Sequence, residues 1–538
     1  MVWRLDNTGE SGALPGLLQG KAPRNPGNPS QAAQIAAGPI GPGSFAPSVD
    51  AATRNAFCAV AILISLRFAV GAWLPLSFDE AYYWLWSKHL ALGYYDHPAL
   101  IAFAIRAGTA IFGDTEFGVR FVPLVASVAA SWAVWRSAAI LLASERSGAT
   151  ACLLFNATLM IAAETMGATP DSLLIAAASF LLWTMAKLGT TQDGRWWLAA
   201  GLAAGMSLFA KYTGFFLCGS LVFWLLASPA GRPWLRTWWP YAGALIALSL
   251  FAPTYYWNMT HDFISFRFQF GRMGAGRANA TNVLEFVGSQ IALASPFVLV
   301  LAGIGLARNS PLASPTRPLG VAAATVWPAL VYFSVHALHD RVQGNWPCFL
   351  YPALAVLAAY PLAKGFEHAL RGRLVRLSRI LILPVAAAIL TVAYAQAFFG
   401  LVPLGRHDPI ARMMAVGFAP VAEEISAEAA RMHAAAIVTT NYATTSWLSF
   451  YTRRSVPVVQ ITDDFRFLSS PRATAALLNG PLLYVTQAPE REIPAVRSHF
   501  ARIAFWGRIA RSHDGMAIGT FDVYTLSGLR GAPLGRLP

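Results

Sequence analysis

The sequence has little charge: only 12% of its 538 residues are Asp, Glu, Lys or Arg, whereas 56% are hydrophobic. A mean hydropathy of +0.48 excludes an ordinary soluble domain, which needs a larger charged surface. Apolar runs of about twenty residues recur, and each is long enough to cross about 30 Å of hydrocarbon. The chain is therefore predicted to be a polytopic α-helical membrane protein.

The chain is also poor in cysteine and lacks nucleotide-binding motifs. Its four cysteines all lie in apolar runs without paired spacing, which excludes a disulfide framework and a zinc site. Neither GxGxxG nor a Walker sequence is present, so chemistry driven by ATP is not expected. The formal net charge of +14 is attributed to basic cytoplasmic loops facing anionic lipid, and nucleic acid is not expected as a partner.

Composition divides the chain into three regions. Residues 1–55 are rich in Gly, Pro, Ala, Ser and Asn and are predicted to form a disordered cytoplasmic tail. Residues 56–399 are predicted to form a transmembrane domain, in which residues 99–113 form an amphipathic helix at the interface. Residues 400–538, where charge rises and short β-branched runs alternate with helical stretches, are predicted to form an extracytoplasmic α/β domain. About eleven spans are expected, at approximately 56–76, 121–142, 149–163, 172–187, 197–210, 213–227, 241–257, 286–306, 320–338, 348–363 and 380–399.

The distribution of basic residues predicts the orientation of these spans. The loops 231–240, 307–319 and 364–379 carry Arg or Lys, and the positive-inside rule places such loops in the cytoplasm. When the predicted spans are counted from a cytoplasmic N-terminus, the segments with unusual polar residues fall on the extracytoplasmic side. These are Asp79, Glu80, Asp96, Asp171, Lys211, the loops 257–282 and 339–346, and everything after residue 399.

Three carboxylates lie within eighteen residues directly after the first apolar run: Asp79, Glu80 and Asp96. Ionisable groups near a bilayer are costly and are usually kept because they act. The pair Asp79-Glu80 suits a general base or a metal ligand, with helix capping as the structural alternative. The sequence Asp96-His97-Pro98 suits a metal-bound phosphate, and capping by Asp96 of a helix that starts near Pro98 is its structural alternative.

Further polar residues interrupt the apolar sequence on the same predicted side. Asp171 opens a span after Thr169 and Pro170, where capping is again the alternative. Lys211 stands alone between two apolar runs, where it either extends its amine to the interface or holds a phosphate. Carboxylates can deprotonate an acceptor or bind a divalent cation, and cations can hold the phosphate of a phosphodiester donor as it becomes the leaving group. The set therefore predicts an enzyme that acts on a lipid-linked phosphosugar.

Several short motifs, in this order, resemble a known family. The set is similar to the bacterial branch of the protein O-mannosyltransferase superfamily, integral-membrane glycosyltransferases of the C-type fold in family 39. That branch includes aminoarabinose lipid A transferases and galacturonosyltransferases of lipopolysaccharide cores. The matching motifs are Phe78–Tyr83, Tyr94–Pro98, Thr169–Asp171, Ala210–Tyr212, Trp257-Asn258 with His261-Asp262, Ser265–Arg267 and Asn345–Pro347.

The resemblance implies an inverting transfer from a polyprenyl-phosphate sugar in the bacterial inner (plasma) membrane, with the active site extracytoplasmic. The acceptor would be an envelope glycolipid, glycan or protein. Asp79 inherits the role of base, beside Glu80 and Asp171 as catalytic residues. Lys211, His97, Arg267 and Arg272 would bind the donor phosphate. Substrate contacts are expected from Tyr82, Tyr83, Tyr95, His261, Asn345 and Trp346.

The resemblance implies that Asp96 would bind a metal ion. The cofactor would then be a divalent cation, Mg²⁺ or Mn²⁺, and no other cofactor is expected. Many relatives have Glu-Lys-Pro where this chain has Asp96-His97-Pro98, so both side chains are shorter here. Three other function classes remain: a transporter or flippase of a lipid-linked sugar, an oligosaccharide polymerase or ligase, and a membrane scaffold. A transporter would place polar groups through the midplane, whereas here they gather at one face, which favours an enzyme.

Overall fold

The computed structural model describes residues 50–538 except 272–278, 311–316, 365–368, 454 and 532–533. Asp50–Pro538 forms one compact unit. Residues 1–49 of the predicted tail lie outside the described residues, as does Arg272. The boundary predicted near residue 400 between two domains stays a prediction.

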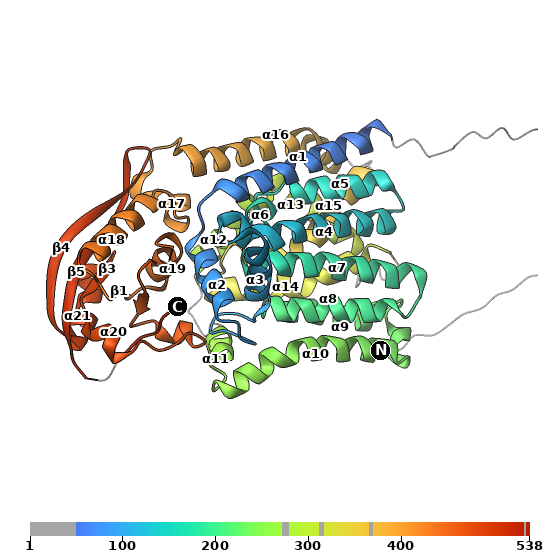
Figure 1. Cartoon of the computed structure of the whole chain (residues 1–538). Helices are drawn as coiled ribbons and strands as arrows, with labels where there is room; N and C mark the ends of the chain where they lie inside the picture. Colours follow the sequence, from blue (N-terminus) through green and yellow to red (C-terminus); the bar gives the residue numbers. More distant parts are fainter. Residues whose placement is uncertain (1–49, 272–278, 311–316, 365–368, 454, 532–533) are drawn as a thin grey trace, which may run out of the picture. The chain divides into compact units, whose positions relative to one another are not determined.

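The described part of the chain between residues 50 and 399 is mainly helical (Figure 1). Its α-helices are α1 (Ala51–Trp73), α2 (Phe78–Lys88), α3 (Leu100–Phe112), α4 (Glu116–Leu142), α5 (Glu145–Asn156), α6 (Leu159–Glu164), α7 (Pro170–Thr191), α8 (Trp196–Ala210), α9 (Gly214–Ala227), α10 (Trp239–Thr260), α11 (Ile264–Gly271), α12 (Ala280–Ala294), α13 (Pro296–Asn309), α14 (Gly320–His339), α15 (Tyr351–Lys364) and α16 (Ala369–Phe399). Two 3₁₀ turns, η1 (Arg232–Arg236) and η2 (Cys348–Leu350), lie between them.

The described helices have the lengths and compositions of a membrane protein, as predicted. Five of them, α1, α4, α7, α14 and α16, are long and apolar enough to cross a membrane. The pair α12 and α13, bent by 102°, adds a sixth span if both halves belong to one crossing. Shorter apolar helices include α3, α8 and α9. The number of eleven spans is therefore not established by these lengths.

Small residues bring the helices of this region close together. Gly201 and Gly205, one turn apart on α8, face Gly243 and Ala247 on α10. A methyl group on Gly201 would lie 2.1 Å from the carbonyl oxygen of Gly243, so only glycine fits this crossing. Helix association inside a bilayer depends on such close backbone approach, because lipid tails are as apolar as leucine. The crossing fixes the end of α8, where Lys211 follows.

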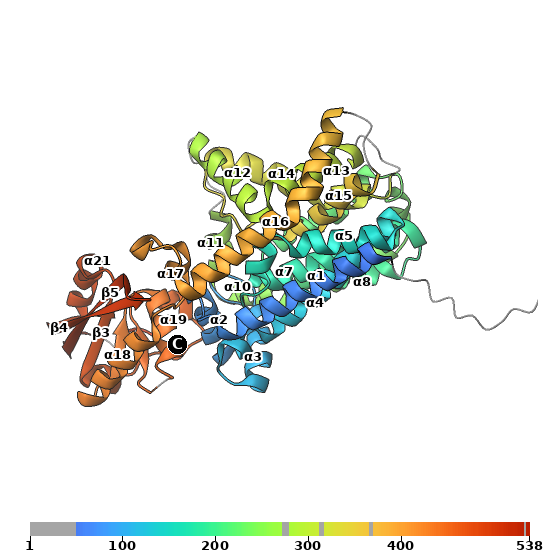
Figure 2. The same cartoon turned by 90° about the horizontal axis from the view of Figure 1, so that it is seen from above.

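Apolar side chains also join the first and last helices of this region. Val70 of α1 and Leu74, which directly follows α1, share a buried cluster with Leu124 of α4 and Ala397 of α16. Figure 2 shows α1 and α16 approaching each other near their carboxyl-terminal ends and diverging toward their other ends.

The chain after residue 399 contains a five-stranded sheet (Figure 1). The strand order is β2-β1-β3-β5-β4, with β2, β1 and β3 parallel and with β5 antiparallel to both β3 and β4. The β-branched runs at 436–440, 456–459, 482–485 and 521–525, which the sequence predicts as strands, fall on β1, β2, β3 and β5, whereas no such run predicts β4. The strands are β1 (Ala436–Thr439), β2 (Val458–Gln460), β3 (Leu482–Thr486), β4 (Phe500–His513) and β5 (Met516–Leu529).

Short helices connect these strands. They are α17 (Pro409–Met413), α18 (Ala419–Arg431), α19 (Tyr442–Tyr451), α20 (Ala475–Asn479) and α21 (Pro489–His499), with the 3₁₀ turns η3 (Gly405–His407) and η4 (Asp464–Phe467). Because β1 and β2 are parallel, their carboxyl ends share one edge of the sheet. Helix α19 follows β1 and packs against α2, and η4 follows β2. This edge therefore meets the segment that carries the predicted acidic residues.

Candidate active site

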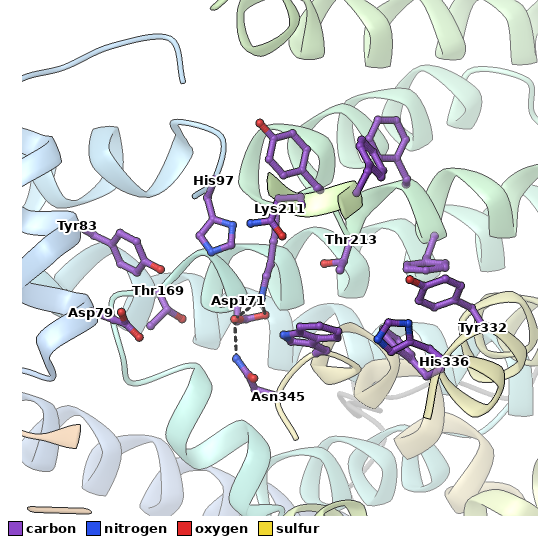
Figure 3. A pocket seen from close by; sticks show the side chains of 17 residues that line it. Asp79, Tyr83, His97, Thr169, Asp171, Lys211, Thr213, Tyr332, His336 and Asn345 are labelled. Atoms are coloured by element: carbon purple, nitrogen blue, oxygen red, sulfur yellow. Dashed lines mark hydrogen bonds and ion pairs between the residues drawn. The ribbon is translucent and has the colours of Figure 1, made fainter. Parts of the chain in front are cut away.

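A cavity of about 450 Å³ brings together half of the residues that the sequence singled out (Figure 3). Its walls come from α2, the segment after α2, the start of α7, the turn between α8 and α9, the start of α9, α11, α14 and the segment before η2. These elements are far apart in the sequence, so only the tertiary fold assembles the site. The lining residues are Asp79, Tyr83, His97, Thr169, Asp171, Lys211, Tyr212, Thr213, Phe215, Phe216, Gln269, Phe270, Tyr332, Phe333, His336, Asn345 and Trp346.

Asp79 lies at one end of the cavity, beside Tyr83 (Figure 3). It is a first-turn residue of α2, whose N-cap is Ser77. The hydroxyl of Tyr442, from α19, donates a hydrogen bond of 3.4 Å to Oδ1 of Asp79. Burial and the neighbouring Asp96 raise the pKa of Asp79 to about 7, although Tyr442 and a nearby arginine lower it. A carboxylate with that pKa, open to a cavity, is suited to take a proton near neutral pH.

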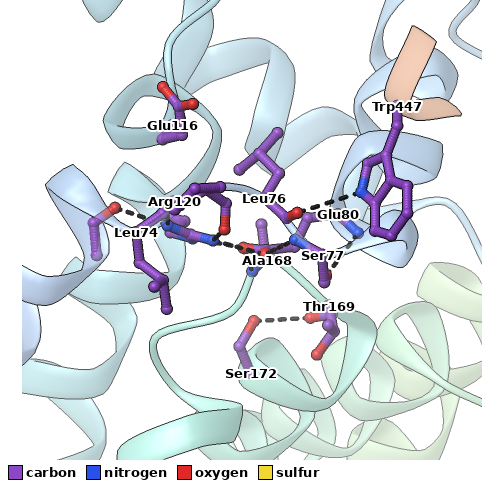
Figure 4. Close-up of polar contacts among 12 residues, drawn as sticks. Leu74, Leu76, Ser77, Glu80, Glu116, Arg120, Ala168, Thr169, Ser172 and Trp447 are labelled. Atoms are coloured by element: carbon purple, nitrogen blue, oxygen red, sulfur yellow. Dashed lines mark hydrogen bonds and ion pairs between the residues drawn. The ribbon is translucent and has the colours of Figure 1, made fainter. Parts of the chain in front are cut away.

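Glu80, the next residue, has a different environment and does not line the cavity. Ser77 and Glu80 form a capping box at the start of α2. Oε1 and Oε2 of Glu80 accept hydrogen bonds of 2.6 and 2.7 Å from Arg120, and Oε1 accepts a further bond of 2.9 Å from the Ala168 backbone (Figure 4). Both partners of the ion pair are fully buried. Successive helical residues point in different directions, so Glu80 anchors the segment before α7 while Asp79 faces the cavity. A catalytic role for Glu80 has no support in this geometry.

Asp171 and Lys211 form a buried ion pair in the middle of the cavity (Figure 3). Pro170 starts α7, so Asp171 is in its first turn, and Lys211 is the extended residue that ends α8. The Lys211 ammonium donates to both carboxylate oxygens of Asp171 at 2.8 and 2.7 Å. Asn345 Nδ2 at 3.1 Å and Cys348 Sγ at 3.0 Å also donate to Asp171. Lys211 is only 7% exposed, so it does not extend to the interface as a lone lysine would.

His97 lies near Lys211 in the same cavity, and the opposite end is mainly aromatic (Figure 3). Tyr332 from α14 lies there, and the ring of Phe216 from α9 packs against it with 4.8 Å between ring centroids. A charged part and an apolar part within one cavity fit a ligand that is itself amphipathic.

A second cavity, of about 350 Å³ and almost wholly apolar, lies among α12, α13, α14 and α15. Phe333 lines both cavities, so the two are neighbours. An apolar chain attached to a ligand in the first cavity has a matching surface in the second.

Asp96 does not face the cavity as a metal ligand would. Its Oδ1 and Oδ2 accept hydrogen bonds of 2.7 and 2.6 Å from Arg466, and Oδ2 also accepts one of 2.9 Å from the Tyr82 hydroxyl. Among the described residues, no three Asp, Glu, His or Cys side chains gather where they could hold a metal ion. A carboxylate engaged by a guanidinium and a phenol does not fit the divalent cation that the sequence placed at Asp96.

Four other predicted residues are not part of the cavity lining. Tyr82 is buried against Asp96, and the Tyr95 ring packs against Phe268 and Phe465. His261 stacks on Trp257 with 4.2 Å between ring centroids, and Arg267 is exposed on α11. Arg272 cannot be placed, because it lies outside the described residues. Tyr83, Asn345 and Trp346 do line the cavity, as predicted for substrate contacts.

The residues that sequence reasoning missed come largely from the chain after residue 399. Tyr442 and Arg466 contact Asp79 and Asp96 from more than 360 residues away. Neither lies in a motif, and no spacing in the sequence relates them to α2. Gln269 and His336, which line the cavity from α11 and α14, also carried no local signal.

Residues 96–257 match the model of a family described as dolichyl-phosphate-mannose-protein mannosyltransferase. The chain is 27% identical over 332 residues to lipid A galacturonosyltransferase RgtD of Rhizobium johnstonii, covering 58% of this chain and 67% of that protein. It is also 27% identical over 187 residues to an undecaprenyl phosphate-α-4-amino-4-deoxy-L-arabinose arabinosyl transferase of Pseudomonas aeruginosa, covering 31% of this chain and 32% of that one. The resemblance predicted from the motifs is therefore confirmed.

Solved structures show the same fold. The crystal structure of ArnT from Cupriavidus metallidurans bound to undecaprenyl phosphate matches with a TM-score of 0.61 at 16% sequence identity. The match covers 88% of this chain and 98% of that one. At this identity the likeness concerns the fold, and it confirms the predicted C-type glycosyltransferase architecture of a membrane protein.

Proposed function

We propose that this membrane protein, which shares the fold of ArnT and resembles lipid A glycosyltransferases, transfers a sugar from a polyprenyl-phosphate donor to a glycolipid of the bacterial envelope. The reaction inverts the anomeric centre. The observation that carries the proposal is the cavity in which Asp79, His97, Asp171 and Lys211 converge from four separate segments. A base at one end and cations in the middle are the two kinds of group that this transfer needs.

Asp79 acts as the base. An acceptor hydroxyl is a poor nucleophile until its proton is taken, and a positioned carboxylate does so as the new glycosidic bond forms. The hydrogen bond from Tyr442 fixes one oxygen of Asp79, and the other oxygen is directed to the acceptor. Tyr83 lies next to it on the cavity wall and contacts the same substrate.

Lys211 and His97 face the donor phosphate. An ammonium has three N–H donors, and in Lys211 two of these are directed to Asp171. The third is available to a phosphate oxygen, so Asp171 orients the cation. The phosphodiester becomes a monoester dianion as the sugar leaves, and a preorganised cation is therefore worth more in the transition state than in the ground state.

The prenyl chain of the donor lies in the apolar cavity among α12, α13, α14 and α15. Burying each CH₂ of such a chain contributes about 0.8 kcal/mol. This contribution supports donor affinity, and it leaves the polar contacts around Lys211 to discriminate the transition state.

The active site is extracytoplasmic in the inner membrane. Eleven apolar segments cross the bilayer with the N-terminus inside, and residues 400–538 form a domain on the outer side. The basic loops 231–240, 307–319 and 364–379 support this orientation. A reaction on that side has no access to nucleotide sugars, in agreement with the lack of a nucleotide motif in the sequence.

The experiment is an assay of the purified protein in detergent or nanodiscs with polyprenyl-phosphate sugars and envelope glycolipids. Mass spectrometry of the glycolipid identifies which sugar is added and is compared with glycolipids from a deletion strain. Asp79→Asn keeps the shape of the side chain and removes its basicity, so it serves as the matched inactive control. Donor that crosses liposome membranes without any glycolipid gaining mass would contradict the proposal and favour a transporter.

A further inference from the structure

Arg466 reaches the acidic end of the site from the carboxyl edge of the sheet. It lies on η4, directly after β2, and its guanidinium contacts both carboxylate oxygens of Asp96 at 2.7 and 2.6 Å. The same guanidinium lies over the ring of Tyr442, 4.5 Å from the centroid, and over that of Tyr95 at 5.5 Å. Its side chain is 19% exposed. A charge held by a carboxylate and two rings has a fixed position.

Tyr442 connects this arrangement to the base. It is the first residue of α19, and its hydroxyl donates to Asp79. Its ring packs edge-on against Tyr82, with 5.3 Å between centroids. Tyr82 in turn donates to both Asp96 Oδ2 and the backbone carbonyl of Arg466. Two elements of the C-terminal region therefore close a continuous network around Asp79 and Asp96.

We infer that Arg466 and Tyr442 are positioning residues of the active site: Arg466 takes the place of a divalent cation at Asp96, and both residues keep Asp79 available as the base. This inference rests on the proposed function, and it deepens it by assigning the C-terminal region a part in catalysis. Arg466 touches neither donor nor acceptor in this arrangement, and it acts through Asp96 and Tyr442.

The charges around Asp79 explain why such a residue is needed. Asp96 is the like charge that raises the pKa of Asp79 most after burial, whereas Tyr442 and Arg466 lower that pKa. Glu80 is already balanced by Arg120. Removal of Arg466 leaves two adjacent carboxylates without a cation of their own, and one of them then holds a proton at neutral pH.

Other groups face Asp79 from the remaining elements. Tyr83 comes from α2, His97 from the segment after it and Glu164 from the end of α6. Asp171 and Lys211 face the same cavity as a neutral pair, since their charges cancel. Arg466 is therefore the cation whose charge is directed at the Asp79 and Asp96 pair.

The experiment measures the acid limb of the pH profile of kcat/KM in three variants. Arg466→Gln removes the cation, so its limb should move to higher pH by about 1 unit, a roughly fivefold loss at pH 7 that approaches tenfold at pH 6 and below. Asp96→Asn removes the like charge, so its limb should move to lower pH. Arg466→Lys keeps the charge and should stay close to the wild type. Arg497→Ala, an exposed arginine on α21, is the matched control and should change nothing.

A second readout needs no substrate. Carbodiimides modify protonated carboxylic acids, and peptide mass spectrometry gives the pH midpoint of Asp79 modification. This midpoint should move to higher pH in Arg466→Gln and to lower pH in Asp96→Asn. If the wild type transfers no sugar while these midpoints still shift, the proposed function fails and the network stands. Sugar transfer can also occur while Arg466→Gln and Asp96→Asn lose rate at every pH and the midpoints of Asp79 modification do not move. In that case Arg466 has only a structural role and the inference is overturned. Where Arg466→Gln does not fold, Tyr442→Phe removes a hydrogen bond that lowers the pKa of Asp79, so the midpoint should move upward, and an unmoved midpoint overturns the inference.

Discussion

The acid limb of the wild-type enzyme is the measurement most closely determined by the structure. As the proposed base, Asp79 would act only when ionised, so activity should be lost as the pH falls through its pKa. Burial beside Asp96 raises that pKa to about 7. An ordinary aspartate, with a pKa of about 3.9, would be ionised throughout the physiological range and would give a flat profile there.

The magnitude follows from this pKa. About 10% of Asp79 is ionised at pH 6 and about 90% at pH 8, so kcat/KM should rise roughly tenfold across that interval and then level off. Asp79→Asn should be expressed normally in the membrane and lose about 100- to 10,000-fold in activity, the usual contribution of a positioned base.

The assay is initial-rate transfer to glycolipid at limiting donor between pH 5 and 9. Glu164, at the end of α6, is a second carboxyl group near the cavity whose pKa is raised by burial, to about 8. Glu164→Gln therefore serves as the control, and its acid limb should remain near pH 7. A wild-type rate that is constant from pH 5 to 8, or an Asp79→Asn enzyme close to wild type, would refute the assignment of the base.

Further outcomes can be measured on the same preparation. Lys211→Ala should lower kcat/KM for the donor by roughly 10- to 1000-fold, corresponding to a charge-assisted contact of about 1.5–4 kcal/mol, and unchanged donor kinetics would remove Lys211 from the site. Glu80→Gln should cost about 3–5 kcal/mol of stability in a thermal unfolding assay, because it leaves the buried charge of Arg120 unpaired, and an unchanged Tm would contradict that. Chelator should leave the wild-type rate unaltered, since the Asp96 carboxylate is engaged by a guanidinium, and loss of activity restored by Mg²⁺ or Mn²⁺ would show the opposite. Reporter fusions after Phe399 should be active only with an extracytoplasmic reporter, and a cytoplasmic signal would reverse the orientation.

The α2 segment shows how far sequence reasoning reached at the site. Asp79 and Glu80 are adjacent and chemically alike, so a motif assigns both to catalysis. The structure separates them, because one faces the cavity and the other meets Arg120 on α4. Lys211 and Asp171 were each identified as candidates, but their pairing depends on how α7 and α8 pack, which no local pattern records.

The sequence by itself determined the class of the protein and the identity of most polar residues in the cavity. Low charge and long apolar runs require a membrane, and carboxylates and a lysine are retained there only for a purpose. The tertiary structure alone decided which of these groups act together. Arg466 and Tyr442 reach Asp96 and Asp79 across more than 360 residues, because parallel strands bring the loops after β1 and β2 to one edge of the sheet. Such contacts depend on chain topology, which the local spacing of residues does not predict.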